Sequence, residues 1–202
     1  MLRAFIAIKL SDELKRQISE LQAELRQRAP DLRGVSWVQP EGIHLTLRFL
    51  GDIEESQIKS LQEVLQTAAC SVGPFSLVAR GLGAFPTAQR VRVLWIGLSG
   101  TSGEQAGADT GTEALRTLQA ATEAGVVKVG FPREERAFTP HLTLARVREA
   151  GAAGPLAALV LAERERLIGK FTAGSLALIK SELRPKGAIY TSLVEVPFGL
   201  RV

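Results

Sequence analysis

The tetrapeptide His-Leu-Thr-Leu occurs twice in this chain of 202 residues, starting at His44 and again at His141. The two copies lie 97 residues apart (141 − 44) and contain the only two histidines of the sequence. A histidine is rarely followed by the same three residues by accident, so the duplication indicates an internal repeat. Both copies lie in stretches typical of β-strands, and the fold must therefore supply two equivalent strands.

Strand geometry decides which side chains of the repeat act together. Successive side chains of a strand point to opposite faces of the sheet. His44 and Thr46 therefore share one face and the leucines the other, and the same holds for His141 and Thr143. If the two halves are related by a pseudo-twofold axis, both strands lie near that axis. Two imidazoles and two hydroxyls would then project into one cleft.

The rest of the chain alternates between strand-like and helix-like segments. We expect strands near residues 5–8, 35–38, 43–50, 75–82, 90–97, 138–146, 171–179 and 188–196. We expect helices near residues 14–25, 58–68 and 115–121 and after Pro155. This order favours an α+β fold with two pseudo-symmetric lobes of antiparallel sheet and helices outside them. We expect one bilobal domain over residues 1–202, whose lobes share strands and divide approximately into 1–88 and 89–202.

Composition narrows the class of protein. With 46% apolar and 23% charged residues the chain is globular and not disordered. A net charge of +4 favours an anionic partner but is too small to identify one. The single cysteine, Cys70, excludes an intramolecular disulfide, and we expect it to be a buried helix residue. The start of the chain is typical of a strand and not of a signal peptide, so we expect a cytoplasmic protein without membrane association. We also expect a monomer.

Two facing imidazoles suit a reaction in which one proton is removed while another is donated, because histidine can do either near neutral pH. The threonine hydroxyls can donate hydrogen bonds to an anionic group held between the rings. The motif supplies no nucleophile, so water or a substrate hydroxyl would attack. Transfer at a phosphodiester fits these requirements. Two histidines and one distant cysteine are fewer ligands than a metal site needs, and we expect no metal and no other cofactor.

The sequence around both motifs resembles a known family. The stretches that carry the resemblance are residues 3–8, 37–51, 92–97, 138–146 and 187–190, so it covers nearly the whole chain. In these stretches the chain resembles the two-histidine phosphoesterases, and within them the RNA 2′,3′-cyclic phosphodiesterases, also called the 2′-5′ RNA ligase family.

The resemblance implies a bilobal fold with a central cleft, and hydrolysis of an RNA terminal 2′,3′-cyclic phosphate to a 2′-phosphomonoester without a metal. It implies that His44 is the proton donor to the departing 3′ oxygen and that His141 is the proton acceptor that activates water. Thr46 and Thr143 would bind the non-bridging phosphate oxygens. The spacing itself is symmetric and does not distinguish acid from base, and the two roles exchange when the reaction runs in reverse.

Two arginines follow the motifs. Arg146 matches an arginine that commonly follows the second motif in the family, which implies a phosphate contact. Strict alternation puts Arg146 on the leucine face, so it reaches the substrate only if its strand bulges or ends there. The same alternation puts Arg48 on the face of the histidines. For both arginines, a solvated charge or a structural ion pair is the alternative to substrate binding.

Other side chains could contact an RNA. Candidates for stacking on a terminal base, with burial in the core as the alternative, are Trp37, Phe49, Phe138 and Tyr190. A small basic cluster that an RNA backbone could use, or that is an ordinary exposed turn, comprises Lys180, Arg184 and Lys186. The polar stretch 99–111 is typical of a flexible surface loop.

The leading hypothesis is a metal-independent cyclic phosphodiesterase acting on RNA 3′ ends. A second enzymatic hypothesis is reversible 2′-5′ joining of RNA, or hydrolysis of a cyclic phosphate on a small nucleotide, by the same side chains. A hypothesis of another class is a non-catalytic RNA-binding module that uses the histidine pair to hold a phosphate.

Overall fold

The computed structural model describes residues 1–30, 33–100, 110–148, 153–184 and 187–199. Most of the predicted 99–111 loop and Lys186 of the basic cluster lie outside the described residues. The helices are α1 (Asp12–Arg28), α2 (Ile58–Ala69), α3 (Thr110–Lys128) and α4 (Ala153–Ala162), with short 3-10 turns η1 (Pro40–Gly42), η2 (Glu55–Gln57) and η3 (Ala88–Arg90). The strands are β1 (Leu2–Lys9), β2 (Val35–Trp37), β3 (His44–Ile53), β4 (Phe75–Phe85), β5 (Val93–Gly100), β6 (His141–Val147), β7 (Leu167–Ala173), β8 (Ser175–Arg184) and β9 (Gly187–Pro197).

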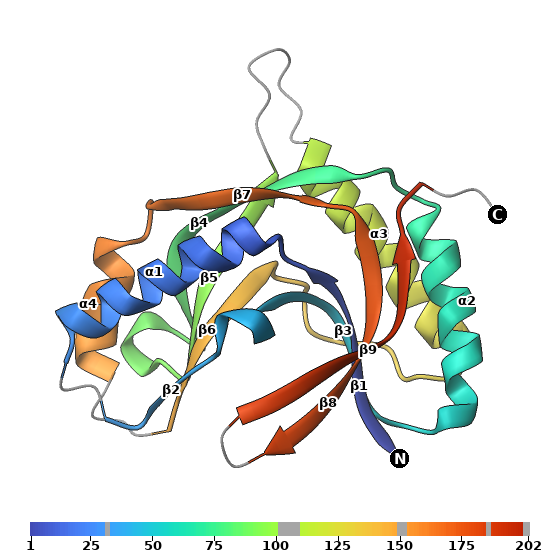
Figure 1. Ribbon diagram of the computed structural model, residues 1–202, viewed down its shortest axis with the longest axis horizontal. Coiled ribbons are helices and arrows are strands. Elements are labelled where there is room, and N and C mark those ends of the chain that lie inside the picture. The colour runs from blue at the N-terminus through green and yellow to red at the C-terminus, as the bar shows by residue number, and fades with distance from the viewer. Residues whose placement is uncertain (31–32, 101–109, 149–152, 185–186, 200–202) are drawn as a thin grey trace.

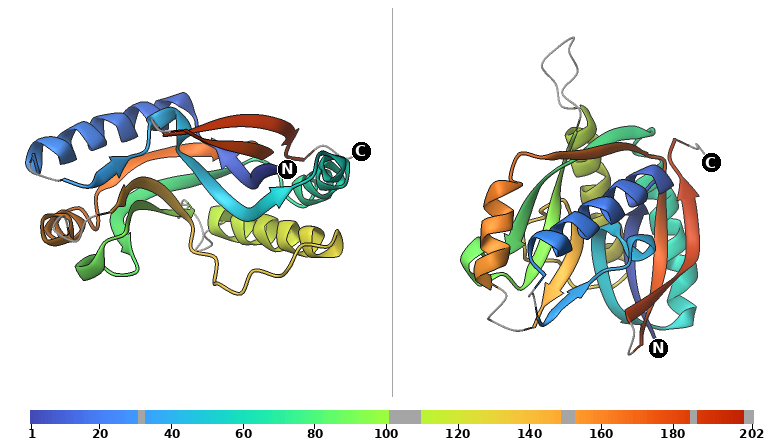
Figure 2. Two further views of the ribbon diagram at one scale, coloured as in Figure 1. Left: turned by 90° about the horizontal axis from the view of Figure 1, so that it is seen from below. Right: turned by 60° about the vertical axis from the view of Figure 1, so that its left-hand side comes forward.

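The strands of the described residues form one antiparallel sheet in the order β7-β4-β5-β6-β3-β1-β8-β9, with the short β2 paired to β6. The sheet curls like part of a barrel, with helices on its outside (Figures 1 and 2). The expected antiparallel α+β architecture is therefore confirmed. The two halves of the sheet are joined through β3 and β6, the strands that carry the two motifs.

The two halves of the sheet draw on distant parts of the chain. One half contains β3, β1, β8 and β9, so both ends of the chain lie in it, and the other half contains β6, β5, β4 and β7. Helices α2 and α3 pack against each other, α2 also against β8 and β9 of the first half and α3 against β3, β4 and β5 of both halves (Figure 1). Helices α1 and α4 contact β7 and β4 of the second half.

The core lies between these helices and the sheet. The leucines of both motifs belong to it, because Leu45, Leu142 and Leu144 are fully buried and Leu47 is 5% exposed. Helix α1 adds its predicted apolar stripe, and its N-cap is formed by Ser11, whose Oγ accepts the Leu14 N–H at 3.3 Å. Burial of one face of each motif strand fixes which face remains for chemistry.

Two expectations from the sequence were wrong in detail. The strand expected over 171–179 is two strands, β7 and β8, separated at Gly174 and paired in different halves of the sheet. Gly174 and Ser175 interrupt the apolar pattern at this point, and the chain changes its pairing partner there. Cys70 is exposed at the end of α2 and is not buried. None of the helices in the described residues is long and apolar enough to span a membrane.

Candidate active site

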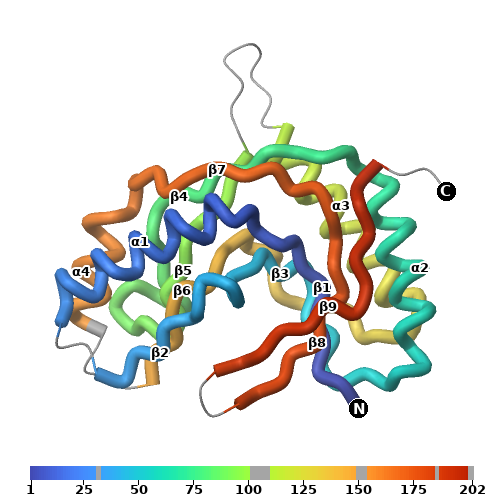
Figure 3. Tube along the Cα trace, in the orientation of Figure 1, coloured from blue at the N-terminus to red at the C-terminus, as the bar shows by residue number. Residues whose placement is uncertain are grey.

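The two motif strands meet at a single pair of residues. Leu45 of β3 pairs with Leu142 of β6 in antiparallel register, and these two leucines occupy the same position in the two copies of the repeat. A local twofold axis therefore passes through this pair, where β3 and β6 lie side by side in Figure 3. In that register His44 lies opposite Thr143 and His141 opposite Thr46.

All four of these polar side chains project from the same side of the sheet, because the paired leucines project from the other. We call this side, which carries His44, Thr46, His141 and Thr143, the histidine face. Diagonal neighbours in an antiparallel ladder are about 7–8 Å apart. At that spacing a phosphate group could be held between the two imidazole rings.

Both imidazoles are anchored in the same way. Nδ1 of His44 lies 2.8 Å from the carbonyl oxygen of Gly42, and Nδ1 of His141 lies 2.7 Å from that of Thr139. A carbonyl oxygen can only accept, so Nδ1 carries the proton in both rings. The Nε2 atoms then hold the lone pair of the neutral ring and are the atoms available for proton transfer.

The surroundings of the two rings differ. His44 stacks on Phe5 with ring centroids 4.4 Å apart and meets the edge of Tyr190 at 5.1 Å. His141 meets Phe85 edge-on at 5.0 Å and lies 6.1 Å from Trp95. Sequence reasoning missed Phe5, Phe85 and Trp95, because strand pairing and not sequence proximity brings them to the histidines.

This enclosure changes the proton affinity of both rings. Burial lowers the pKa of His44 to about 4, against the hydrogen bond to Gly42, and the positive charge of Arg146 and the neighbouring His141 lower it further. Burial also lowers the pKa of His141, against the Thr139 hydrogen bond, with Arg146 again acting in the same direction as burial. Both rings are therefore neutral in the free protein near pH 7, and a bound anion would be needed to protonate one.

Each motif strand contains a β-bulge at the same repeat position. In β6, Trp95 pairs with Thr143 but Leu94 pairs with Ala145, so Leu144 is the extra residue. In β3, Ala7 pairs with Thr46 but Ile6 pairs with Arg48, so Leu47 is the extra one. Each bulge shifts the alternation of the side chains by one residue beyond it.

The bulge in β6 returns Arg146 to the histidine face. Arg146 pairs with Val93 and Thr143 with Trp95, and these β5 residues are two apart and share a face. Arg146 is exposed, and its charge acts on the pKa values of His44, His141 and Tyr190. The sequence predicted that Arg146 reaches the histidine face only if its strand bulges or ends there, and β6 does bulge before Arg146.

The bulge in β3 has the opposite consequence for Arg48. The expectation that Arg48 shares the face of His44 is wrong, because strict alternation ends at Leu47. Arg48 is 7% exposed and lies on the side of α3, with its Nε 2.9 Å from a carboxylate oxygen of Glu123. Arg48 therefore forms a structural ion pair, which was the alternative to substrate binding, and it does not lie on the histidine face.

The bulge in β3 also brings Phe49 to the histidine face, at the position that Arg146 occupies in the second copy. Phe49 is 59% exposed, with its ring centroid 6.0 Å from that of Phe5. Trp37 and Phe138 pack against the core instead, and Arg26 lies over the Trp37 ring. Of the four aromatic candidates, Phe49 and Tyr190 therefore lie near the histidines.

The remaining charged candidates that the structure describes lie on β8. Lys180, in the middle of the strand, and Arg184, at its end, approach Glu182 at 3.0 and 3.8 Å. Arg3, which sequence reasoning did not single out, influences the pKa of Tyr190 and so lies close to the histidine face. Among the described residues no cluster of His, Cys, Asp and Glu side chains could hold a metal ion.

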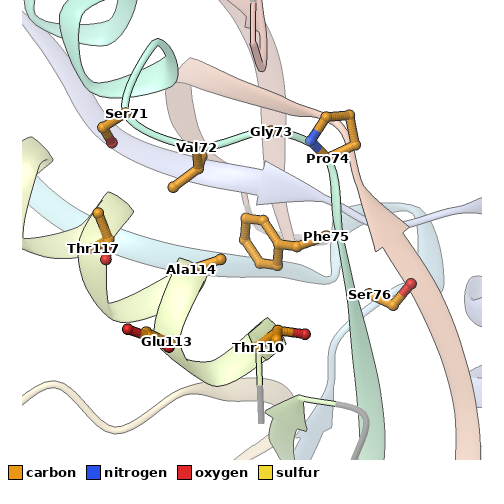
Figure 4. Close-up of a pocket in the computed structure, with 10 residues that line it drawn as sticks. All are labelled: Ser71, Val72, Gly73, Pro74, Phe75, Ser76, Thr110, Glu113, Ala114 and Thr117. Atoms are coloured by element: carbon orange, nitrogen blue, oxygen red, sulfur yellow. The ribbon is translucent and has the colours of Figure 1, made fainter. Parts of the chain in front are cut away.

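A surface hollow of about 540 Å³ lies elsewhere in the molecule. It is bounded by residues 71–76, between α2 and β4, and by the first turns of α3 (Figure 4). None of the predicted site residues lines it, so this hollow is not the candidate active site.

Comparison with known proteins gives the same family that the two motifs resemble. A model of the family described as LigT like Phosphoesterase matches residues 8–95 and 107–190. An RNA 2′,3′-cyclic phosphodiesterase of Methanothermobacter thermautotrophicus is 32% identical over 191 residues, with 95% of this chain and 96% of that protein covered. A protein of the same name from Aquifex aeolicus is 32% identical over 205 residues, with 98% of both chains covered.

Solved structures are similar over the same extent. The protein TT0787 of Thermus thermophilus matches with a TM-score of 0.74 and 29% identity, covering 98% of both chains. Escherichia coli LigT in complex with 3′-AMP matches with a TM-score of 0.72 over 98% of this chain and 99% of its own. At 23% identity the second likeness supports the fold.

Proposed function

This chain belongs to the LigT-like phosphoesterase family, and from that premise we propose that it hydrolyses the terminal 2′,3′-cyclic phosphate of RNA to a 2′-phosphomonoester. Relatives that match nearly the whole chain are named RNA 2′,3′-cyclic phosphodiesterases, and the 2′-phosphate product is our proposal. The observation that carries the mechanism is the matched pair of Nδ1–carbonyl hydrogen bonds, which leaves two Nε2 atoms for proton transfer.

The proposed reaction needs one donor and one acceptor on either side of phosphorus. The oxygen of a water molecule bonds to phosphorus while the bond from phosphorus to the 3′ oxygen breaks. Nε2 of His141 accepts a proton from the water, and Nε2 of His44 gives its proton to the 3′ oxygen. One water is consumed, and the two rings return to their starting states by proton exchange with solvent.

The division of roles is the one that the family resemblance implies, and it requires substrate binding to overcome the effect of burial on His44. His44 is the more enclosed ring, and the attraction between an imidazolium and an anionic phosphate is stronger where water is excluded. Substrate binding would therefore raise the pKa of His44 and protonate it for the donor role. His141 makes its hydrogen bond in a more exposed setting, where a water molecule can reach the ring.

The neighbouring side chains fit the binding of an anion with an attached base. Thr46 and Thr143 can donate hydrogen bonds to the non-bridging oxygens, one from each strand. Arg146 adds a guanidinium on the same face, suited to a charged phosphate oxygen. Phe49 offers an exposed ring on which the terminal base can stack.

The direct test is incubation of an RNA oligonucleotide ending in a 2′,3′-cyclic phosphate with the protein in EDTA. Phosphorus NMR of the product then identifies which ribose oxygen keeps the phosphate. We expect turnover and a 2′-phosphate. A 3′-phosphate would contradict the assignment of donor and acceptor, because the other oxygen would have been protonated. Turnover that persists in the His44→Ala, His141→Ala double variant would contradict the mechanism as a whole.

A further inference from the structure

Arg48 connects the strand of the first motif to the chain segment that leads into the second. Its guanidinium forms an ion pair with Glu123 of α3, with Nε and Oε2 2.9 Å apart but not aligned as a hydrogen bond. Nη2 donates to the carbonyl of Pro132, and Nη1 lies 3.4 Å from a carboxylate oxygen of Glu134. One buried side chain of β3 therefore contacts both α3 and residues 132–134.

Residues 129–140, which we call the approach segment, contain no helix or strand between α3 and β6. Glu123 helps to hold the segment, because its Oε1 accepts the Glu134 N–H at 2.8 Å. The segment ends at Thr139 and Pro140, directly before His141. Since the Thr139 carbonyl accepts the His141 Nδ1–H, the path of the segment sets the orientation of that ring.

The first motif does not need such a tie. The Gly42 carbonyl that anchors His44 belongs to the 3-10 turn η1, closed by the Gly42 N–H to Gln39 at 2.9 Å. A Cβ on Gly42 would lie 3.0 Å from the Tyr190 ring, so this turn is packed tightly from outside. The residue that matches Arg48 in the second copy is Ala145, which shows that the bulge itself does not require an arginine.

A buried ion pair is by itself weak evidence for stability, because removing two charges from water costs about as much as their attraction returns. The Arg48 contacts are better explained by the position that they impose on the approach segment. We propose that Arg48 is a positioning residue for His141: it ties the approach segment to β3 and α3, and so holds the Thr139 carbonyl where His141 Nδ1 donates to it. The expected effect of Arg48 on kcat rests on the proposed function. Its expected effect on the orientation of the His141 ring does not.

The test variant replaces both charges of the buried pair, Arg48→Met with Glu123→Gln, so that no unpaired charge stays buried. With a cyclic-phosphate RNA as substrate we expect kcat to fall about 10- to 100-fold, the scale of a misplaced catalytic group, with KM little changed. Nitrogen-15 NMR of labelled histidine gives a second readout, since the chain has only two imidazoles. We expect the Nδ1-protonated tautomer of His141 to lose population while His44 keeps its own.

The matched control removes a different ion pair between distant elements, Arg28→Met with Glu163→Gln. That pair joins α1 to the residue after α4, away from both histidines. We expect it to lower the melting temperature while kcat and both histidine signals stay as in the wild type. Glu134→Gln is a milder second variant, because it leaves the buried Arg48–Glu123 pair intact. It should change kcat and the His141 signal in the same direction by a smaller factor.

Wild-type kcat and unchanged His141 signals in both Arg48→Met with Glu123→Gln and Glu134→Gln would overturn the proposal. Equal changes at His44 and His141 would overturn it too, since they would indicate a general loss of structure. If the wild-type protein hydrolyses no cyclic phosphate, the proposed function fails. The nitrogen spectra still decide separately whether Arg48 positions His141.

Discussion

The strands β3 and β6 share a motif, a bulge and a hydrogen-bonding pattern, but they diverge at the two positions after the bulge. In β3 these positions hold Arg48, buried against α3, and Phe49, exposed on the histidine face. In β6 they hold Ala145, buried, and Arg146, exposed on the histidine face. The shared part supplies the two imidazoles of the proposed proton transfers. The divergent part makes the candidate site asymmetric, with a cation on one side of the proposed phosphate position and an aromatic ring on the other.

The two histidines are equivalent in the repeat but differ in their surroundings. His44 lies against Phe5 and Tyr190 and has its pKa lowered to about 4, whereas His141 lies in the more open half of the site. Identical residues in equivalent strands thus acquire different proton affinities from their neighbours. This asymmetry fits the proposed roles of one ring as acid and the other as base.

The largest expected effect comes from removing either imidazole. His44→Ala and His141→Ala should each lower kcat on a cyclic-phosphate RNA by roughly a hundred- to ten-thousandfold, the usual contribution of one proton-transfer group. Their difference should appear with a substrate whose 3′ leaving atom is sulfur, because a thiolate departs without a proton. His44→Ala should then recover most of its activity and His141→Ala none. Equal recovery in both variants would contradict the assigned roles.

The pH dependence of stability should show the different burial of the two rings. The pKa of His44 in the fold, about 4, lies below its unfolded value of 6.5, so the unfolded chain binds more protons between these pH values. The contribution of neutral His44 is complete above pH 6.5 and is lost as the pH falls, by about 3 kcal/mol at pH 4. Urea unfolding from pH 7.5 to 4 measures it.

The control for this experiment is His44→Phe, which keeps an aromatic ring but cannot bind a proton. Carboxylate titration is common to both proteins and cancels in the difference between their free energies of unfolding. We expect the wild type to lose stability relative to the variant as the pH falls below 6.5. Parallel curves for the two proteins would show that His44 is not enclosed as described.

A smaller effect should follow from Arg146→Gln, which removes the cation from the histidine face. A hydrogen bond to a charged group contributes about 1.5–3 kcal/mol, so kcat/KM should fall by roughly 10- to 150-fold. Arg116→Gln, on the exposed side of α3, is the control and should leave kcat/KM unchanged. A loss that is the same in both variants would indicate general electrostatic attraction and not a contact at the site.

The sequence alone predicted much of this site, and the limits of that prediction have a physical cause. Alternation and the repeat identified both histidines, both threonines and the buried leucines, because these depend on strand geometry near each motif. The bulges were not predicted, since an extra residue in a strand is established only against its partner strand. In β6 the adjacent apolar pair Leu144 and Ala145 is a sequence signal that could have indicated one. In β3 the matching pair is Leu47 and Arg48. An arginine does not indicate a buried position, because the burial of Arg48 depends on ion pairs with residues distant in the sequence.

The smallest expected effect is that of Phe49→Ala, and it tests the aromatic side of the asymmetry. Stacking of one base on an aromatic ring contributes about 1 kcal/mol at an exposed position, so KM for a cyclic-phosphate RNA should rise roughly fivefold with kcat nearly unchanged. The matched substrate is a ribose 2′,3′-cyclic phosphate without a base, for which wild type and variant should have the same KM. Phe49 and Arg146 occupy equivalent positions of the repeat. We expect the effect of Phe49→Ala on KM to depend on the presence of the base, and the effect of Arg146→Gln not to depend on it. If Phe49→Ala weakens binding of both substrates equally, the ring contributes to the shape of the site and the base lies elsewhere.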